Sequence, residues 1–197
     1  IDWPCEVKTN FSNVNLGMKK RNITGLNWAF SLEEEILILE DDNLPIDDFF
    51  KFIEEVVPIY RDNEQILQIT GVNWQDDKIR GNASYYFSKY NNLWGWVTWK
   101  RNWKKYDVKI SEWPNYKNSA NWKKKCPNDI ERYYWEKLFD EYFAKEINSW
   151  AYAWLFCAFY YNCLTVTPNV NLVKNSGLDG DGTHEFKNKS GLLKPYG

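Results

Sequence analysis

The stretch Ile36-Leu-Ile-Leu-Glu-Asp-Asp-Asn-Leu-Pro45 governs how the rest of the chain is interpreted. Its four consecutive aliphatic residues predict a short strand buried on both faces, as in a parallel sheet. Three carboxylates, Glu40, Asp41 and Asp42, follow at the C-terminal end of this strand. Because adjacent negative charges repel one another, we expect a cation to offset them. A solvated acidic turn before a helix is the alternative.

The C-terminal edge of a parallel sheet is where α/β proteins bind ligands. A hard divalent ion that carries a diphosphate fits there, because Mg²⁺ and Mn²⁺ take carboxylate and phosphate oxygens together. Asp42 is the best direct metal ligand, Asp41 could hold a ribose or sugar hydroxyl, and Glu40 could orient the site from behind. His184, the only histidine, lies in Gly180-Asp-Gly-Thr-His184 and could complete the metal shell or contact a phosphate. An exposed histidine in a tail is an equally good reading.

The segments around this stretch predict strands that alternate with helices. In the first half we expect strands at 5–9, 36–39 and 66–69, and helices at 18–32 and from about 47 to 58. This β-α-β-α-β order is typical of a parallel sheet with crossover helices. In the second half we expect strands at 85–88 and 163–166, a helix over 94–106, and two helices within 128–161.

Composition excludes several classes of function. The 25 basic and 27 acidic residues give a net charge of -2, and no basic stretch is long enough to indicate nucleic acid as the main partner. No apolar run approaches the roughly 20 residues of a membrane span, and the chain opens without the pattern of a signal peptide. None of the four cysteines falls in a CxxC pair, and Cys157 and Cys163 read as buried free thiols, which indicates the cytoplasm.

Two further motifs suit contact with a sugar. Trp94-Gly95-Trp96 places two aromatic rings around a glycine that permits close approach of the backbone, although a helix start packed into the core is the alternative. Gly71-Val-Asn73 follows a predicted strand, again at the edge where ligands bind.

Taken together and in this order, these motifs resemble bacterial sugar-nucleotide-dependent glycosyltransferases of the GT-A fold, and more distantly enzymes of the N-acetylglucosaminyltransferase I type. The resemblance covers nearly the whole chain. Its carriers are Asn15-Leu-Gly17, Ile38-Leu-Glu-Asp-Asp42 with Asp48-Phe-Phe50, Gly71-Val-Asn73, Trp94-Gly-Trp-Val-Thr-Trp99, Ser149-Trp150, Pro168-Asn-Val-Asn-Leu-Val173, Asn175 and Gly182-Thr-His184. It implies an α/β three-layer sandwich with a mainly parallel central sheet, formed by one domain over residues 1–197.

The resemblance also implies roles. Glu40-Asp41-Asp42 would fill the place of the DxD-type motif, in which the last Asp binds Mn²⁺ or Mg²⁺ and the metal bridges the nucleotide diphosphate as a Lewis acid. An acceptor hydroxyl, deprotonated by a carboxylate, would then attack the anomeric carbon with inversion. Residues 1–75 would bind metal and donor, and residues 76–197 would supply the acceptor part and a C-terminal lid. The implied donor contacts are Asn15, Gly17, Lys19, Glu40 and Asp41, and the implied acceptor contacts are Gly71, Asn73, Trp94, Gly95, Trp96 and Trp150.

Two departures from the family pattern affect these expectations. The family has a further β-α-β unit before the position of residue 1, so the chain looks N-terminally truncated, and we expect an exposed sheet edge that favours a homo-oligomer or a partner chain. Many similar sequences carry Asp after the Trp that matches Trp150, where this chain has Ala151. Glu146 is the nearby substitute as catalytic base.

The leading hypothesis is transfer of a sugar from a nucleotide-diphosphate donor to a glycan or lipid-linked acceptor, in surface polysaccharide or lipopolysaccharide synthesis. The first alternative is a non-catalytic sugar-binding or scaffolding relative of the same fold. The second is a metal-dependent nucleotidyltransferase, which would release pyrophosphate in place of a nucleoside diphosphate.

Overall fold

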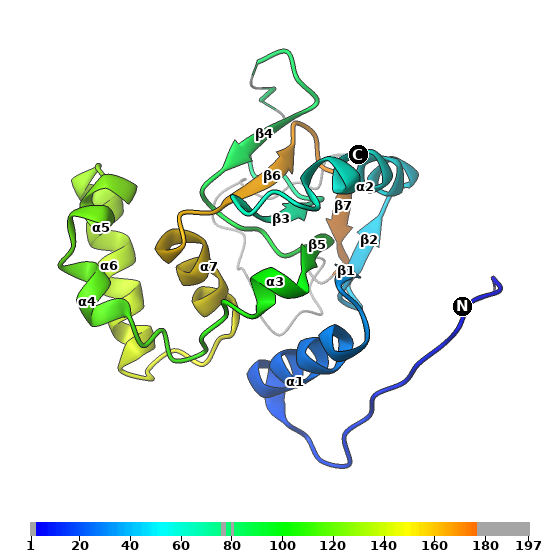
Figure 1. The fold of residues 1–197 in the computed structure, drawn as a ribbon, viewed down its shortest axis with the longest axis horizontal. Helices are drawn as coiled ribbons and strands as arrows, with labels where there is room; N and C mark the ends of the chain where they lie inside the picture. Colours follow the sequence, from blue (N-terminus) through cyan, green and yellow to red (C-terminus); the bar gives the residue numbers. More distant parts are fainter. Residues whose placement is uncertain (1–2, 76–77, 80, 177–197) are drawn as a thin grey trace.

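The computed structural model describes residues 3–75, 78–79 and 81–176. Its centre is a five-stranded sheet with the strand order β1-β5-β3-β6-β4 (Figure 1). The strands are β1 (Glu35–Ile38), β3 (Ile66–Thr70), β4 (Tyr85–Ser88), β5 (Trp96–Trp99) and β6 (Leu164–Pro168). A separate antiparallel pair is formed by β2 (Asn43–Pro45) and β7 (Val173–Asn175).

The protein is a mixed α/β protein, but the expectation of a mainly parallel sheet is not confirmed. Only β3 and β6 pair in parallel, whereas β1–β5, β5–β3 and β6–β4 are antiparallel. The reason is the position of β5, which lies between β1 and β3 and runs against both. As a result β1, β3 and β6 point one way and end at one edge of the sheet, where β5 begins.

Strand β1 is at the side of the sheet, which corrects a second expectation. In the described part of the chain it pairs with β5 alone, and its four residues are half-buried. Four aliphatic residues in a row predicted burial on both faces, but an edge strand has neighbours on one side only. Among the described strands none lies along its other edge, and such an edge can accept another strand.

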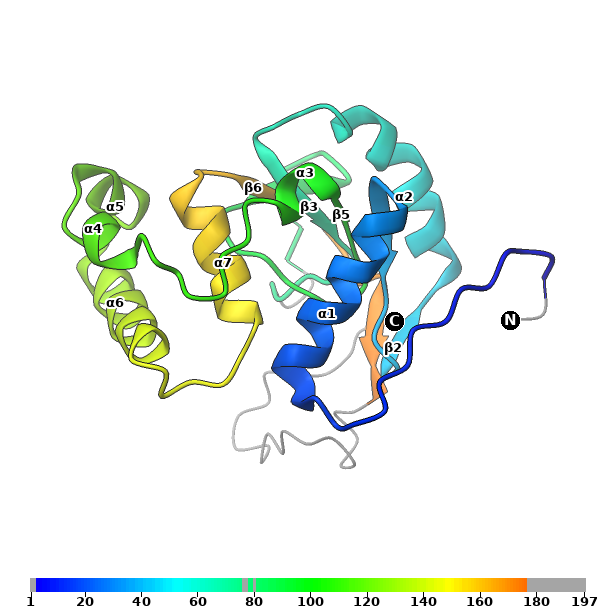
Figure 2. The ribbon, with the colours of Figure 1, turned by 60° about the horizontal axis from the view of Figure 1, so that its bottom comes forward.

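Helices cover both faces of the sheet (Figures 1 and 2). On one face α1 (Gly17–Leu32), α3 (Lys100–Trp103) and α7 (Ala151–Tyr160) pack around Leu67 and Trp96. On the other face α2 (Asp47–Tyr60) packs against Val97, Trp99 and Val166. Successive β5 residues therefore enter two different apolar layers, as the period of a strand requires.

Three more helices form a unit beside α7, away from the sheet (Figure 1). They are α4 (Trp113–Lys117), α5 (Ala120–Lys125) and α6 (Asp129–Phe143). Helix α7 faces both parts: Trp154 and Cys157 pack toward the sheet, while Phe156 and Phe159 pack into the helical unit. This two-sided burial explains why residues 151–160 are apolar nearly all round.

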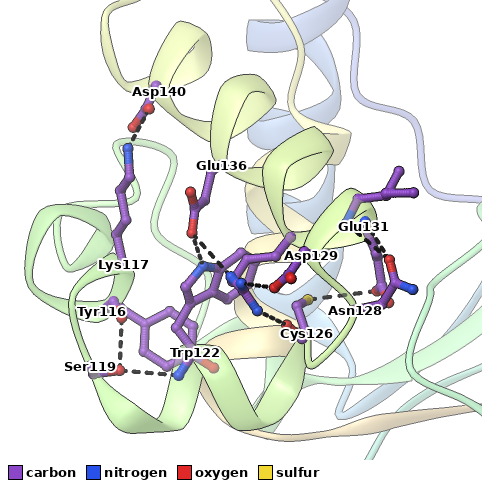
Figure 3. A network of polar contacts seen from close by, with 12 residues as sticks. Tyr116, Lys117, Ser119, Trp122, Cys126, Asn128, Asp129, Glu131, Glu136 and Asp140 are labelled. Carbon is purple, nitrogen blue, oxygen red and sulfur yellow. Dashed lines mark hydrogen bonds and ion pairs between the residues drawn. The ribbon is translucent and has the colours of Figure 1, made fainter.

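A network of polar contacts holds the helical unit together (Figure 3). The Trp122 indole donates to Glu136 over 2.8 Å, and Lys117 pairs with Asp140 over 2.6 Å. Asn128 caps α6 by accepting from the backbone N–H groups of residues 130 and 131. Glu131 accepts from the Tyr90 hydroxyl over 2.6 Å, which fastens the segment after β4 to α6. These carboxylates therefore have structural roles within the helical unit.

Most expected elements are present, with two exceptions. The helices over 17–32, 47–60, 129–143 and 151–160 and the strands at 35–38, 66–70, 85–88 and 164–168 agree with the predictions within a few residues. The helix over 94–106 was wrong, because residues 96–99 form β5 and only Lys100–Trp103 is helical. The strand at 5–9 is absent from the described structure. Within the described ranges, no helix is long and apolar enough to cross a membrane.

Candidate functional site

The ends of several strands meet at the edge of the sheet that carries the acidic turn. Gly71 follows β3 and Gly95 precedes β5, and the Gly71 N–H donates to the Gly95 carbonyl over 2.7 Å. The Gly71 carbonyl accepts from Leu172 N over 2.9 Å, which brings in the segment between β6 and β7. The acidic turn joins this group through Asn43. The structure therefore brings together three of the predicted motifs: 40–42, 71–73 and 94–96.

Asn43 connects the acidic turn to the glycine pair, a role that the sequence analysis missed. Its Oδ1 accepts from Gly95 N over 2.9 Å and from Glu40 N over 3.3 Å, while its Nδ2 donates to Asp42 Oδ1 over 2.9 Å. The residue is 7% exposed. An Asn placed after three carboxylates was the available signal, but its burial and its contact with Gly95 follow from the tertiary fold.

The acidic turn carries negative charge without a protein counter-ion in the described structure. Asp41 is exposed, and Glu40 and Asp42 are half-buried. None of the three forms an ion pair with a described lysine or arginine. Burial raises the pKa of Glu40 above its ordinary value, and the charges of Asp42 and Asp41 raise it further. A bound cation would oppose all of these effects.

The donor atoms of this turn are hard carboxylate oxygens, which suit Mg²⁺ or Mn²⁺. The described residues contain no cluster of three or more Asp, Glu, Cys or His side chains arranged to hold a metal. The turn therefore fits an ion held by one or two carboxylates, with water and phosphate as the other ligands, and does not fit an all-protein cage. His184, the other predicted metal ligand, lies outside the described residues.

Gly71 and Gly95 are required by close packing beneath the site. A Cβ on Gly71 would lie 2.5 Å from Val173 Cγ2 and 2.6 Å from the Phe49 ring. Gly95 has φ +58, and a Cβ there would lie 2.7 Å from the same Val173 methyl group. Both glycines are buried, so the observed contacts give them a packing role, and their predicted contact with an acceptor stays a prediction.

Asn73 is also committed to contacts within the protein. Its Nδ2 donates to the Pro168 carbonyl over 2.8 Å, its Oδ1 accepts from Gln75 N over 2.8 Å, and its N–H donates to Asn171 Oδ1 over 2.7 Å. These bonds fix the chain after β3 to the chain after β6. Asn73 thus shapes the edge of the site, whereas the sequence predicted direct contact with an acceptor.

The aromatic residues divide into a surface pair and a core group. Trp94 is half-buried and meets Trp74, with ring centroids 4.6 Å apart and planes at 60°. Trp74 is 40% exposed and was not among the predicted residues, because a single Trp in a loop gives no sign of its neighbours. Trp96 and Trp150, both predicted acceptor contacts, are instead buried at 0% and 4% exposure and stack on one another in the core.

Other predicted residues lie on different elements. Asn15 accepts from Gly17 N over 2.8 Å, and Gly17 has φ +68, so the two form the turn that begins α1. Lys19 follows in the first turn of α1, with its Nζ 4.6 Å from the centroid of the Tyr142 ring. Glu146 is exposed in the connection between α6 and α7, next to Lys145. No described contact links these residues to the acidic turn.

Comparison with known proteins adds no identification. No model of a known protein family matches the chain, and a search of curated proteins finds no significant match. The geometry of the strand ends is therefore the basis for a functional assignment.

Proposed function

We propose that this chain is a metal-dependent, inverting glycosyltransferase of the GT-A type that moves a sugar from a nucleotide-diphosphate donor to a glycan or lipid-linked acceptor. One observation carries the proposal: an acidic turn without a described counter-ion lies at the edge of the sheet where the half-buried Trp94 meets the exposed Trp74. A diphosphate with its cation suits the acidic turn, and a sugar ring suits the aromatic pair. The mixed sheet with helices on both faces and the resemblance in sequence motifs support the same fold type.

We assign Asp42 as the metal ligand and Asp41 as a contact to the donor. Glu40 would orient the turn without binding the metal directly. The partial burial of Glu40 and its raised pKa suit a group that orients the turn, since its charge is already disfavoured without a cation. Mn²⁺ or Mg²⁺, when bound, would supply Lewis-acid stabilisation of the leaving diphosphate. The protein would contribute the turn itself, held in shape by Asn43.

Trp74 and Trp94 are the residues that we assign to the acceptor or to the transferred sugar. Their edge-on contact fixes both rings, and the exposed fraction of Trp74 leaves ring surface for stacking. Aromatic rings bound in this way lose little conformational entropy when a ligand binds. Glu146 is the base that the family pattern suggests, since it is the carboxylate that precedes Ala151 in sequence, and no described contact joins it to the acidic turn. Unchanged turnover in Glu146→Gln would exclude it.

The test is release of nucleoside diphosphate from a panel of nucleotide sugars in the presence of Mn²⁺ and oligosaccharide acceptors. We expect Asp42→Ala to abolish release, while Glu54→Ala, which removes an equal charge from an exposed position on α2, leaves it unchanged. Equal release by wild type and Asp42→Ala would contradict the metal assignment. Release of pyrophosphate from a nucleoside triphosphate would indicate the nucleotidyltransferase alternative. Sugar binding without turnover would indicate the non-catalytic one.

Association and compartment are part of the same proposal. The free edge of β1 supports pairing with a second chain, and sedimentation at two concentrations tests it, because a strictly monomeric protein would contradict it. Cys126, Cys157 and Cys163 are buried free thiols, which supports the cytoplasm as the site of action.

A further inference from the structure

A groove separate from the acidic turn lies between the start of α1, the end of α6 and the loop after α3. It encloses about 670 Å³, a size that suits a small ligand. Three of its lining residues are lysines that come from three different segments: Lys19, Lys109 and Lys145. Tyr142, Phe143 and Ser111 contribute aromatic and hydroxyl surface, and no described lining residue is acidic.

The positive charge of this groove is only partly offset in the described structure, where the Asp107 carboxylate interacts electrostatically with Lys109. None of the three lysines forms an ion pair with a described carboxylate. Lys19 is half-buried over the Tyr142 ring, and its burial lowers the pKa of its ammonium group. Like charges gathered around one hollow repel one another, and an anion placed among them would relieve that repulsion.

The walls of the groove are held in place by hydrogen bonds. The Tyr142 hydroxyl donates to the Val108 carbonyl over 3.0 Å, which joins α6 to the loop after α3. That loop is shaped by Asp107, whose carboxylate accepts from Lys109 N over 2.8 Å and from Ser111 N over 2.7 Å. The lysines therefore project from a built frame, which favours binding because less freedom is lost.

Lys145 lies at the turn that ends α6 and brings its charge to the groove. Its φ of +67 is left-handed, and it occupies the position after the C-cap of α6, where glycine is favoured. The Lys145 N–H donates to the Tyr142 carbonyl and the Glu146 N–H to the Glu141 carbonyl, both over 3.0 Å, the pattern of a Schellman motif. A cation at a helix C-terminus is favourable, but this does not explain why Lys19 and Lys109 gather at the same place.

We propose that this basic groove binds a phosphate-bearing ligand, a phosphate ester whose phosphate lies among the three lysines and whose sugar or apolar part lies on Phe143. Lysine ammonium groups bind phosphate as strong charged donors, and the exposed Phe143 ring offers a face for stacking. The site goes beyond the proposed function, since it needs neither the metal nor the donor nucleotide. Within sugar transfer, it would hold a phosphorylated acceptor.

The test measures binding of glucose 1-phosphate by calorimetry without metal, with glucose as the uncharged comparison. The variant is Lys109→Ala/Lys145→Gly, which leaves Lys19 intact because that residue is also a donor candidate. We expect binding to the wild type and affinity about tenfold weaker or worse in the variant, since two charged hydrogen bonds are removed. Lys123→Ala/Lys124→Ala removes two exposed lysines of α5 and should bind as the wild type does.

The same variant reports on folding. Lys145→Gly removes a left-handed non-glycine residue, so its melting temperature should match or exceed that of the wild type while binding falls. Loss of affinity in a stable variant thus cannot be attributed to unfolding. Asp42→Ala should leave this binding unchanged, which separates failure of the groove from failure of the proposed nucleotide site.

Vesicles distinguish a soluble phosphate ester from a lipid headgroup. Binding to vesicles of phosphatidylglycerol in phosphatidylcholine, without binding of glucose 1-phosphate, would identify a lipid headgroup as the ligand. This holds provided that Lys109→Ala/Lys145→Gly loses the vesicle binding and Lys123→Ala/Lys124→Ala keeps it. The proposal is overturned if neither glucose 1-phosphate nor the vesicles bind, or if Lys109→Ala/Lys145→Gly binds like the wild type. It is also overturned if Lys123→Ala/Lys124→Ala lowers the affinity as much as Lys109→Ala/Lys145→Gly does.

Discussion

Replacing Asn43 by alanine tests whether the acidic turn is held to the sheet as the structure describes. The change leaves the buried Gly95 N–H without its hydrogen-bond partner at 2.9 Å, which lowers the free energy of unfolding by about 1–3 kcal/mol. It also removes the 2.9 Å hydrogen bond to Asp42, which contributes about 1 kcal/mol. Glu40 is only half-buried, so we expect water to replace Asn43 as the partner of its N–H. We therefore expect the free energy of unfolding to fall by about 2–4 kcal/mol, and the melting temperature by roughly 5–15 °C for a chain of this size.

Urea unfolding followed by far-UV circular dichroism measures this loss. The matched control is Asn63→Ala, the same substitution at an exposed turn, where Oδ1 accepts one bond from Gln65 N over 2.9 Å. There water can replace the lost partner, so we expect a change below about 1 kcal/mol. If Asn43→Ala loses no more stability than Asn63→Ala, the buried link between the acidic turn and Gly95 is refuted.

Three further predictions concern the same edge of the sheet. The pKa of Glu40 is raised in the folded protein, so the stability that its protonated form contributes is present below its ordinary pKa and is lost as pH rises through the raised value. In metal-free urea titrations, the free energy of unfolding of Glu40→Gln should therefore increase relative to that of the wild type as pH rises from about 4 to 7. A difference that does not change with pH would contradict this. Gly71→Ala should lower the free energy of unfolding by about 1–3 kcal/mol in the same titrations, because there is no space for the added Cβ. Gly25→Ala, in open space on α1, should leave the free energy of unfolding unchanged or raise it by up to about 1 kcal/mol, and equal effects of the two substitutions would count against the packing described. Trp74→Ala should raise the KM for the acceptor several-fold with little change in melting temperature, whereas Trp3→Ala, also an exposed tryptophan, should change neither.

Short-range features of the fold could be predicted from the sequence. The strand before the acidic turn, the helix from about residue 47 and the two helices within 128–161 each depend on neighbouring residues, and each is present. The placement of β5 could not be predicted in this way. Trp96 and Trp99 are three apart, a spacing that suits one face of a helix, and burial of all four β5 residues removes the alternation that would have indicated a strand.

The candidate site shows the same limit. Its acidic turn was evident because the three carboxylates are adjacent, whereas Asn43 acts on Gly95, 52 residues away. Trp74 and Trp94 meet across a loop. Trp96, in the same motif as Trp94, points into the core because it is the first residue of β5, whereas Trp94 precedes the strand and is separated from it by Gly95, which has φ +58. The sequence could indicate the chemistry of this edge, while the fold decides which side chains reach its surface.

Calorimetric titration with UDP and with GDP, with and without Mn²⁺, shows whether the acidic turn binds a metal and a nucleoside diphosphate together. We expect one of the two nucleotides to bind the wild type only when Mn²⁺ is present, Asp42→Ala to lose this binding, and Glu54→Ala to keep it. Binding that is independent of the metal, or that survives in Asp42→Ala, would contradict the assignment of the acidic turn as the metal-diphosphate site.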